Sequence, residues 1–177
     1  MRGGLRSIER ALAVFGFLVL VYFVAFNLSF IKSPSMAPTL RGDPAKPDWV
    51  LSEKITYRLR RPRRWETVLF KDQEIGVQII KRVAGLPGET IALEGGGVRI
   101  DGAAIPRPES LGFLKYYSYG RLAPGKSEDC GRGYFLLGDD SKDSQDSRFE
   151  GPLAPERIDG RPWLIVWPRS RWGFVNP

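Results

Sequence analysis

The chain has 177 residues, of which 42% are hydrophobic, enough for one domain with a buried core but not for two full domains. Its formal net charge of +7 suits an anionic membrane surface or nucleic acid on composition alone. With no histidine and one cysteine, Cys130, the sequence excludes a Ser-His-Asp triad, a Cys-His pair and an intramolecular disulfide, and we expect no metal or other cofactor.

The first predicted element is an apolar helix. Residues 11–26 contain no charged side chain, and the uncharged stretch continues to Ile31, twenty-one residues in all. This length is close to the ~20 residues that a helix needs to cross a bilayer. A cleavable signal peptide would have an apolar region of ~7 to 15 residues before a small-x-small motif, whereas Phe30, Ile31 and Lys32 follow here. We therefore predict a transmembrane anchor over residues 11–31.

The charges around this anchor predict its orientation. Arg2, Arg6 and Arg10 precede it with only Glu9 opposing them, which favours a cytoplasmic N-terminal tail, residues 1–10. The remaining residues, 32–177, would then lie outside the cytoplasm. We expect a single-pass protein of the cell membrane, with lipid as one partner.

The rest of the chain reads as mostly β, because short β-prone runs alternate with turn residues and no long helical period occurs. The candidate strands are Val50–Ile55, Glu66–Phe70, Val77–Val83, Thr90–Leu93, Val98–Ile100, Tyr134–Leu137 and Pro162–Trp167. Residues 95–97 (GGG) and 101–102 (DG) predict tight turns. We expect a compact antiparallel β-sheet domain after the transmembrane helix, with a variable excursion around residues 104–132.

Two further features of this domain concern its surface. The densest basic run, residues 54–64, lacks the repeated interleaving of aromatic side chains that single-stranded nucleic acid requires. We interpret it as a solvated loop facing lipid headgroups, and we expect no nucleic-acid partner. Of Trp163, Trp167 and Trp172, we expect at least two in a buried aromatic core and the others at the membrane interface.

A serine follows the predicted anchor directly. Ser35 stands between Pro34 and Met36 in residues 31–40 (IKSPSMAPTL), where Pro34 and Pro38 prevent a regular helix and present the serine near the membrane surface. A serine beside proline is far more often a turn residue than a nucleophile. A nucleophilic role for Ser35 therefore depends on a partner base.

Lys81 is the candidate base. In residues 76–83 (GVQIIKRV), two-residue periodicity places Lys81 on the same face of a strand as Val77, Ile79 and Val83. Burial on an apolar face disfavours the ammonium form and lowers the pKa of a lysine, so that a neutral amine can accept a serine proton. The structural alternative is that Lys81 packs its stem and extends its amine to solvent.

Three segments together resemble the bacterial type I signal peptidases. They are residues 33–40 (SPSMAPTL), residues 81–89 (KRVAGLPGE) and residues 138–148 (GDDSKDSQDSR), and residues 160–171 resemble the closing strand of that family. Their order, their spacing and the preceding anchor agree across nearly the whole chain. The resemblance implies a membrane-bound serine endopeptidase that removes signal peptides from secretory preproteins after small residues, at sites of the Ala-x-Ala type.

The resemblance also implies a role for each matching residue. Ser35 would be the nucleophile and Lys81 its base, with Ser144 orienting the lysine. The Ser35 amide and the Ser33 hydroxyl would form the oxyanion hole. Supporting ion pairs would involve Arg82 with Asp139 and Asp146 with Arg148, and substrate would contact Ile31, Met36, Leu40, Gln78, Ile79 and Ile80. The secretion translocon is a further implied partner.

Some positions depart from the family pattern. Pro34 replaces the glycine that is commonest between the two serines, Lys32 stands where an apolar residue or proline is frequent, and Asp140 and Ser141 replace an asparagine-arginine pair. Two other interpretations also fit the sequence. One is a different Ser-Lys peptidase, either a self-cleaving repressor-like protein, which the anchor disfavours, or an enzyme dedicated to one exported substrate. The other is a catalytically silent β-module anchored to the membrane.

Overall fold

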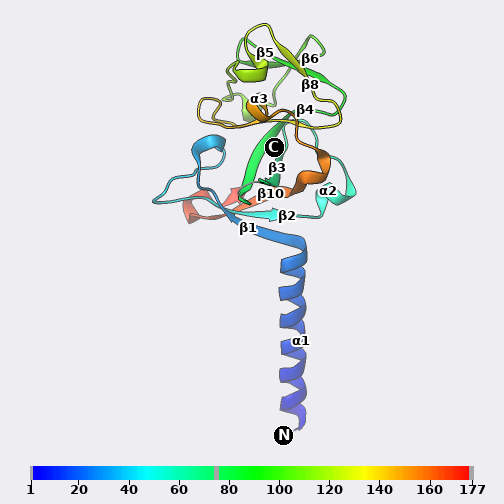
Figure 1. Ribbon diagram of the computed structural model, residues 1–177. Coiled ribbons are helices and arrows are strands. Elements are labelled where there is room, and N and C mark those ends of the chain that lie inside the picture. Colours follow the sequence, from blue (N-terminus) through cyan, green and yellow to red (C-terminus); the bar gives the residue numbers. More distant parts are fainter. Residues whose placement is uncertain (1, 74–75, 176–177) are drawn as a thin grey trace.

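A computed structural model describes the backbone of residues 2–73 and 76–175, with side chains from residue 8 onward. A single helix, α1 (Arg2–Ala25), projects from one end of a β-rich body (Figure 1). Within it, Ile8–Ala25 is long and apolar enough to cross a membrane by length and composition, with a mean hydropathy of 2.0. Met1, the first residue of the predicted N-terminal tail, lies outside the described residues, and the rest of that tail belongs to α1.

The helix ends earlier than the apolar stretch does. Residues 26–30, which we had assigned to the anchor, form strand β1 (Phe26–Phe30), and Ile31 follows in extended chain. The strand has a physical reason: Asn27 and Ser29 alternate with apolar residues, giving the two-residue period of a sheet. β1 pairs antiparallel with β2 (Trp49–Glu53), and the Lys54 amide donates a hydrogen bond to the Ala25 carbonyl at the end of α1.

The larger sheet has the order β1-β2-β10-β3-β4-β9, and these neighbouring strands all pair antiparallel. Its remaining strands are β3 (Thr67–Lys71), β4 (Gln78–Gly85), β9 (Phe135–Leu137), β10 (Ile158–Trp167) and β11 (Gly173–Phe174), the last of which pairs with β10. The long strand β10 joins the two halves, because its first part pairs with β3 and its second part with β2. The predicted mostly β, antiparallel fold is confirmed.

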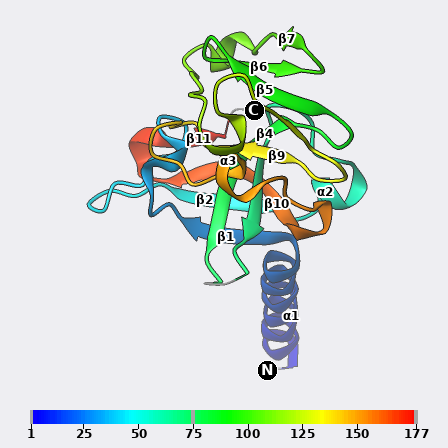
Figure 2. The ribbon, with the colours of Figure 1, turned by 45° about the horizontal axis from the view of Figure 1, so that its top comes forward.

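A smaller sheet lies at the end of the body farthest from α1 (Figure 2). Its order is β7-β6-β5-β8, formed by β5 (Thr90–Glu94), β6 (Gly97–Ile100), β7 (Ala103–Ile105) and β8 (Ser127–Asp129). Both predicted turns are present: Gly95 and Gly96 connect β5 to β6, and Asp101 and Gly102 connect β6 to β7, all four with positive φ. β7 and β8 are not among the predicted strands, because three residues are too few to show a two-residue period.

The excursion around residues 104–132 contributes to the hydrophobic core. Its apolar side chains Leu111, Leu114, Tyr116 and Leu122 are buried in a core cluster shared with β5, β6 and β9. Between β7 and β8 the described elements of this segment are short 3-10 turns, so its buried residues follow no regular period in the sequence.

The tryptophans differ from the expectation. Trp163, Trp167 and Trp172 are all exposed, with 37%, 51% and 65% of their surface accessible. Phe30, Trp49 and Phe174 are also exposed. Together the six aromatic side chains belong to β1, β2, β10, β11 and the turn before β11. Ring contacts join Phe30 to Trp49, Trp49 to Trp167 and Trp163 to Phe174. We call these six residues the aromatic face. Alternation along β2 turns Val50 and Ser52 into the core and leaves Trp49 outside. In β10 the register shifts between Pro162 and Leu164 and between Ile165 and Trp167, so Ile165 is buried while Trp163 and Trp167 remain outside.

Candidate active site

A cavity of about 770 Å³ lies between the chain that follows β1, the first half of β4 and the loop before α3 (Ser147–Glu150). Ser33, Ser35, Lys81 and Ser144 all line it. These residues come from three segments that are far apart in sequence, and the antiparallel pairing of β4 with β3 and β9 brings two of them together. The sequence-predicted residues therefore meet at one place.

Ser35 is fixed by backbone contacts. It lies in a 3-10 turn, Pro34–Met36, whose closing hydrogen bond runs from the Ala37 amide to the Pro34 carbonyl. The turn does not use the Ser35 amide, since that group precedes the first hydrogen bond of the turn. The Ser35 carbonyl accepts from the Asp140 amide at 3.1 Å, and the Ser35 Oγ lies 3.1 Å from the Ser33 Oγ. Ser35 is buried.

Lys81 lies on the apolar face of β4 that the sequence predicted. It pairs with Val68 of β3, and Ile79 and Val83 on the same side pack in one core cluster with Val68. Only 3% of its surface is accessible. This burial lowers the pKa of Lys81 to about 8, against the carboxylate of Asp146, which acts to raise it. The alternative in which Lys81 extends its amine to solvent is therefore wrong.

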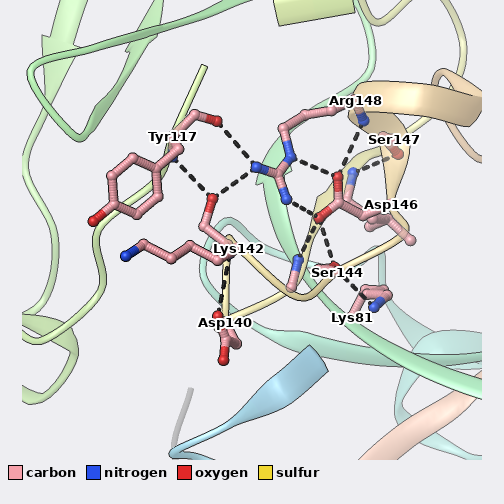
Figure 3. Close-up of polar contacts among 11 residues, drawn as sticks. Lys81, Tyr117, Asp140, Lys142, Ser144, Asp146, Ser147 and Arg148 are labelled. Carbon is pink, nitrogen blue, oxygen red and sulfur yellow. Dashed lines mark hydrogen bonds and ion pairs between the residues drawn. The ribbon is translucent and has the colours of Figure 1, made fainter. Parts of the chain in front are cut away.

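The Lys81 amine is held by a chain of polar contacts (Figure 3). Its Nζ donates to the Ser144 Oγ at 3.0 Å, and the Ser144 hydroxyl donates to the Asp146 carboxylate at 2.7 Å. Asp146 in turn accepts two hydrogen bonds from the Arg148 guanidinium, and neither of these two side chains is accessible to solvent. Because its only hydroxyl hydrogen goes to Asp146, Ser144 presents a lone pair to the lysine.

A second buried ion pair lies next to Lys81 on β4. The Arg82 Nε and NH2 each lie 2.7 Å from an oxygen of Asp139, and neither side chain is accessible. Arg82 also donates to the Trp65 carbonyl, and the Thr39 hydroxyl donates to Asp139. This pair therefore ties β4 to the loop that carries Ser144 and to the segment that carries Ser35.

Gly138 packs against both the backbone of Ser35 and the side chain of Ser144. A Cβ atom at this position would collide with the Ser144 side chain and with the Ser35 carbonyl oxygen. The close packing of residue 138 against both Ser35 and Ser144 therefore requires glycine here.

The predicted substrate-contacting residues are divided between the cavity and the core. Ile31, Met36, Gln78, Ile79 and Ile80 line the cavity. Leu40 does not appear among the lining residues in the described part of the chain, and it is fully buried in a core cluster with Met36 and Ile80. The expectation for Leu40, which came from the family resemblance, is therefore wrong: the Leu40 amide donates a hydrogen bond to the Met36 carbonyl, and the Leu40 side chain packs in the core.

Three supporting residues had no clear signature in the sequence. Ser141, buried beside Arg148, accepts hydrogen bonds from the Tyr117 amide and from the Arg148 NH1. Thr39 bridges to Asp139, and Gly42 packs so closely on the Ser33 backbone that any side chain there would collide with it. The matching segments contained Thr39 and Ser141, but only tertiary contacts show what they do.

The described ranges contain no group of three or more cysteine, aspartate or glutamate side chains that could hold a metal ion. The polar side chains that line the cavity include the hydroxyls of Ser33, Ser35 and Ser144, the amines of Lys32, Lys81 and Lys142, the amides of Gln78 and Gln145 and the carboxylate of Asp143. A hydroxyl that shares a cavity with a buried amine suits acyl transfer by a hydroxyl nucleophile.

Comparisons with known proteins agree with this chemistry. The family model described as signal peptidase, peptidase S26, matches residues 5–167. A probable signal peptidase I-2 of Synechocystis sp. is 34% identical over 160 residues, which cover 87% of this chain and 68% of the relative. Signal peptidase I of Leptolyngbya laminosa is 33% identical over 163 residues, which cover 88% of this chain and 75% of the relative.

A solved structure of a signal peptidase I from Enterococcus faecalis is also similar, with 23% identity and a TM-score of 0.43, over 58% of this chain and 97% of that one. The family match over residues 5–167 and the two relatives above 30% identity identify the protein class. The chain belongs to the signal peptidase family, peptidase S26, and is a serine peptidase that removes signal peptides from preproteins.

Proposed function

We propose that this signal peptidase works through a Ser35–Lys81 dyad. The observation that carries the proposal is the buried Lys81 amine, which lines the same cavity as the Ser35 hydroxyl and is oriented there by Ser144. A pKa of about 8 leaves a useful fraction of neutral amine near neutral pH. In a catalytically silent β-module the buried lysine amine would have no role, although its burial in apolar surroundings costs free energy of folding.

In the proposed reaction the Ser35 Oγ attacks the carbonyl carbon of the scissile bond and its proton passes to the Lys81 Nζ. The protonated amine then gives that proton to the leaving nitrogen, and an acyl-enzyme remains on Ser35. A water molecule, deprotonated by Lys81, hydrolyses the ester. In the structure Ser35 Oγ contacts Ser33 rather than Lys81, and since catalytic hydrogen bonds often tighten only with substrate bound, we expect the serine-lysine contact to form in the complex.

The same turn supplies candidate oxyanion donors. The Ser35 amide is not used by its own 3-10 turn, and the Ser33 hydroxyl lies beside the Ser35 Oγ. Pro34 has no amide hydrogen, but neither proposed donor is the Pro34 nitrogen, so this departure from the family pattern leaves the pair intact. We propose both groups as the oxyanion hole.

Substrate would bind as an extended strand along β4. Residues 78–81 pair with β3 on one edge, whereas β9 pairs with β4 only from Arg82 onward, so among the described strands the other edge has no partner at residues 78–81. This free edge borders the cavity, and the hydrogen bond from Ser29 to Gln78 closes one end of it. The apolar walls at Ile31, Ile79 and Ile80 support small side chains at the cleavage site, of the Ala-x-Ala type.

Membrane attachment completes the proposal. α1 would span the cell membrane with its N-terminus in the cytoplasm, and residues 32–177 would lie outside, where lipid and the secretion translocon are the expected partners. The aromatic face lies on the strands next to α1 (Figure 1), and exposed tryptophan is favoured at membrane interfaces. Tethering enzyme and signal peptide to one bilayer raises their effective concentration.

The test is cleavage of a precursor with an Ala-x-Ala site by the detergent-solubilised full chain, followed by N-terminal sequencing of the product. We expect the new terminus directly after the second alanine, and no product with Ser35→Ala. Cleavage at unrelated positions, or equal cleavage by the variant, would contradict the proposal. An enzyme dedicated to one exported substrate would leave general precursors intact while cutting that substrate by the same dyad.

A further inference from the structure

The guanidinium of Arg148 has two sides, and only one of them faces Asp146. Its Nε and NH2 donate to the Asp146 carboxylate, whereas NH1 donates to the Ser141 Oγ at 2.7 Å and to the Tyr117 carbonyl at 3.0 Å (Figure 3). All three nitrogens are thus occupied in a side chain with no solvent access. The orientation of Arg148 therefore depends on Ser141 and Tyr117 as much as on its ion-pair partner.

Ser141 makes this arrangement from the loop that also carries Ser144. It is buried, and its Oγ accepts a second hydrogen bond from the Tyr117 amide at 2.9 Å. One hydroxyl thereby joins the loop before α3, the Arg148 guanidinium and the excursion around residues 104–132. Within the described residues, Ser141 is the side chain that accepts a hydrogen bond from the Arg148 NH1, and the other acceptor is the Tyr117 backbone carbonyl.

The excursion is fitted to Arg148 over several residues. Gly120, with φ at +56°, lies so close to the Arg148 carbonyl that a Cβ would collide with it. The Tyr119 ring lies 5.7 Å from the Arg148 guanidinium carbon, in cation-π range. The excursion therefore closes over the polar chain that ends at Lys81.

We propose that Ser141 is a positioning residue for Lys81, acting by holding Arg148 against Asp146, so that Asp146 accepts the Ser144 hydroxyl and Ser144 presents its lone pair to the lysine amine. This inference rests on the proposed role of Lys81 as the base. The hydrogen bonds of the Ser141 hydroxyl go to Tyr117 and Arg148 and not to Ser35 or Lys81, so Ser141 acts on the lysine only through the residues between them.

The proposal has an electrostatic consequence. The charged groups that act on Lys81 are Asp146, Arg148, Glu150 and Asp139, and Lys142 and Asp143 stand on the cavity wall. Asp146 raises the pKa of Lys81 and Arg148 lowers it. When Arg148 loses its Ser141 contact and turns away from Asp146, the guanidinium charge offsets less of the effect that the Asp146 carboxylate has on the pKa of Lys81. The protonated amine is then favoured, and the pKa of Lys81 rises.

The test compares Ser141→Ala with two other variants in the full chain in detergent. The matched control is Ser118→Ala, which removes a hydroxyl from the excursion that donates to the Leu93 carbonyl and has no contact with Arg148. For Ser141→Ala we expect the acid limb of kcat/KM to move to higher pH by about half a unit, a roughly threefold loss of rate below the midpoint that disappears at high pH. Ser141→Thr, which keeps the hydroxyl, should restore the original midpoint.

A second measurement separates this proposal from the dyad itself. The Lys81 side chain is titrated by NMR with lysine labelled in carbon-13, its signal assigned by Lys81→Met. A higher pKa of Lys81 in Ser141→Ala, with the pKa unchanged in Ser118→Ala, supports the positioning role. This holds even if the wild-type protein cuts no precursor, because the absence of cleavage would overturn only the proposed function. An unchanged midpoint and an unchanged lysine titration in folded Ser141→Ala overturn the inference.

Discussion

The amine of Lys81 and the hydroxyl of Ser144 are 3.0 Å apart, and the hydroxyl donates its own hydrogen bond to the Asp146 carboxylate. This contact orients a lysine that has almost no access to solvent. A buried amine held as a hydrogen-bond donor, in the cavity that also contains Ser35, is the arrangement from which we derive the following predictions.

Removing either member of the dyad should abolish cleavage while leaving the fold intact. For Ser35→Ala and Lys81→Met we expect kcat to fall by about a thousandfold or more, and the double variant to lose no more than either single one, because the two groups act as a unit. Precursor cleavage measured by gel shift, with circular dichroism to check folding, tests this. Additive losses in the double variant would indicate that the two residues work independently.

The rate should depend on pH through Lys81. Burial lowers the pKa of this lysine to about 8, and the base works only when neutral, so activity is lost as the pH falls through that value. Below the midpoint we expect kcat/KM to decrease about tenfold per pH unit. The profile of kcat/KM against pH is the measurement, and an activity that stays flat down to about pH 4 would remove Lys81 as the base.

The Arg82–Asp139 pair should contribute to stability rather than to chemistry. Asp139→Asn leaves the Arg82 charge buried without its partner, and we expect the free energy of unfolding to fall by about 3 to 5 kcal/mol. Glu94→Gln is the matched control, since it breaks an exposed ion pair with Arg99 that is worth less than about 1 kcal/mol. Urea unfolding of both variants in detergent compares them, and equal losses would contradict the distinction.

Gly138→Ala should disturb the contact between the two halves of the site. The new methyl group would collide with Ser144 and with the Ser35 carbonyl, and a displacement of about 1 Å can cost roughly a hundredfold in rate. Gly97→Ala is the control, because a Cβ there meets only the Glu94 carbonyl oxygen at 3.5 Å, an ordinary contact. Steady-state kinetics on the two variants should show the loss for Gly138→Ala alone.

The aromatic face should matter only when substrate is in a bilayer. For the double variant Trp167→Ser and Trp172→Ser, we expect slower cleavage of a membrane-embedded precursor in vesicles and unchanged cleavage of a soluble peptide. Phe113→Ser removes an equally exposed aromatic ring from the excursion, outside the aromatic face, and should change neither rate. Equal slowing on both substrates would point to a folding defect instead.

The strands, and the meeting of Ser35 and Lys81 at one cavity, could be predicted from sequence because the strand signals are local and the segments that carry the two residues are distinctive. The seven predicted strands correspond to β2, β3, β4, β5, β6, β9 and β10, with ends shifted by a few residues. The two-residue period correctly placed Lys81 beside Val83 on an apolar face. The pairing of Ser144 with Lys81, which the family resemblance implied, is also present as a hydrogen bond.

The errors came from features that tertiary contacts decide. Residues 26–31 continue an apolar run, and only the pairing of β1 with β2 shows that the helix stops at Ala25. Leu40 looks like a cavity residue until the inward turn of the chain buries it. The exposed tryptophans depart from the usual burial of large aromatic side chains, since they lie on the outer face of the sheet, which the described elements of the chain do not cover.

The covalent intermediate provides the most direct test of the central claim. A peptide ester with an Ala-x-Ala sequence is mixed with the full chain, the reaction is stopped with acid, and mass spectrometry locates the acyl group. We predict an acyl group on the proteolytic fragment that contains Ser35, its absence in Ser35→Ala, and much slower formation in Lys81→Met. An acyl group on any other residue, or one that forms at the wild-type rate without Lys81, would contradict the account.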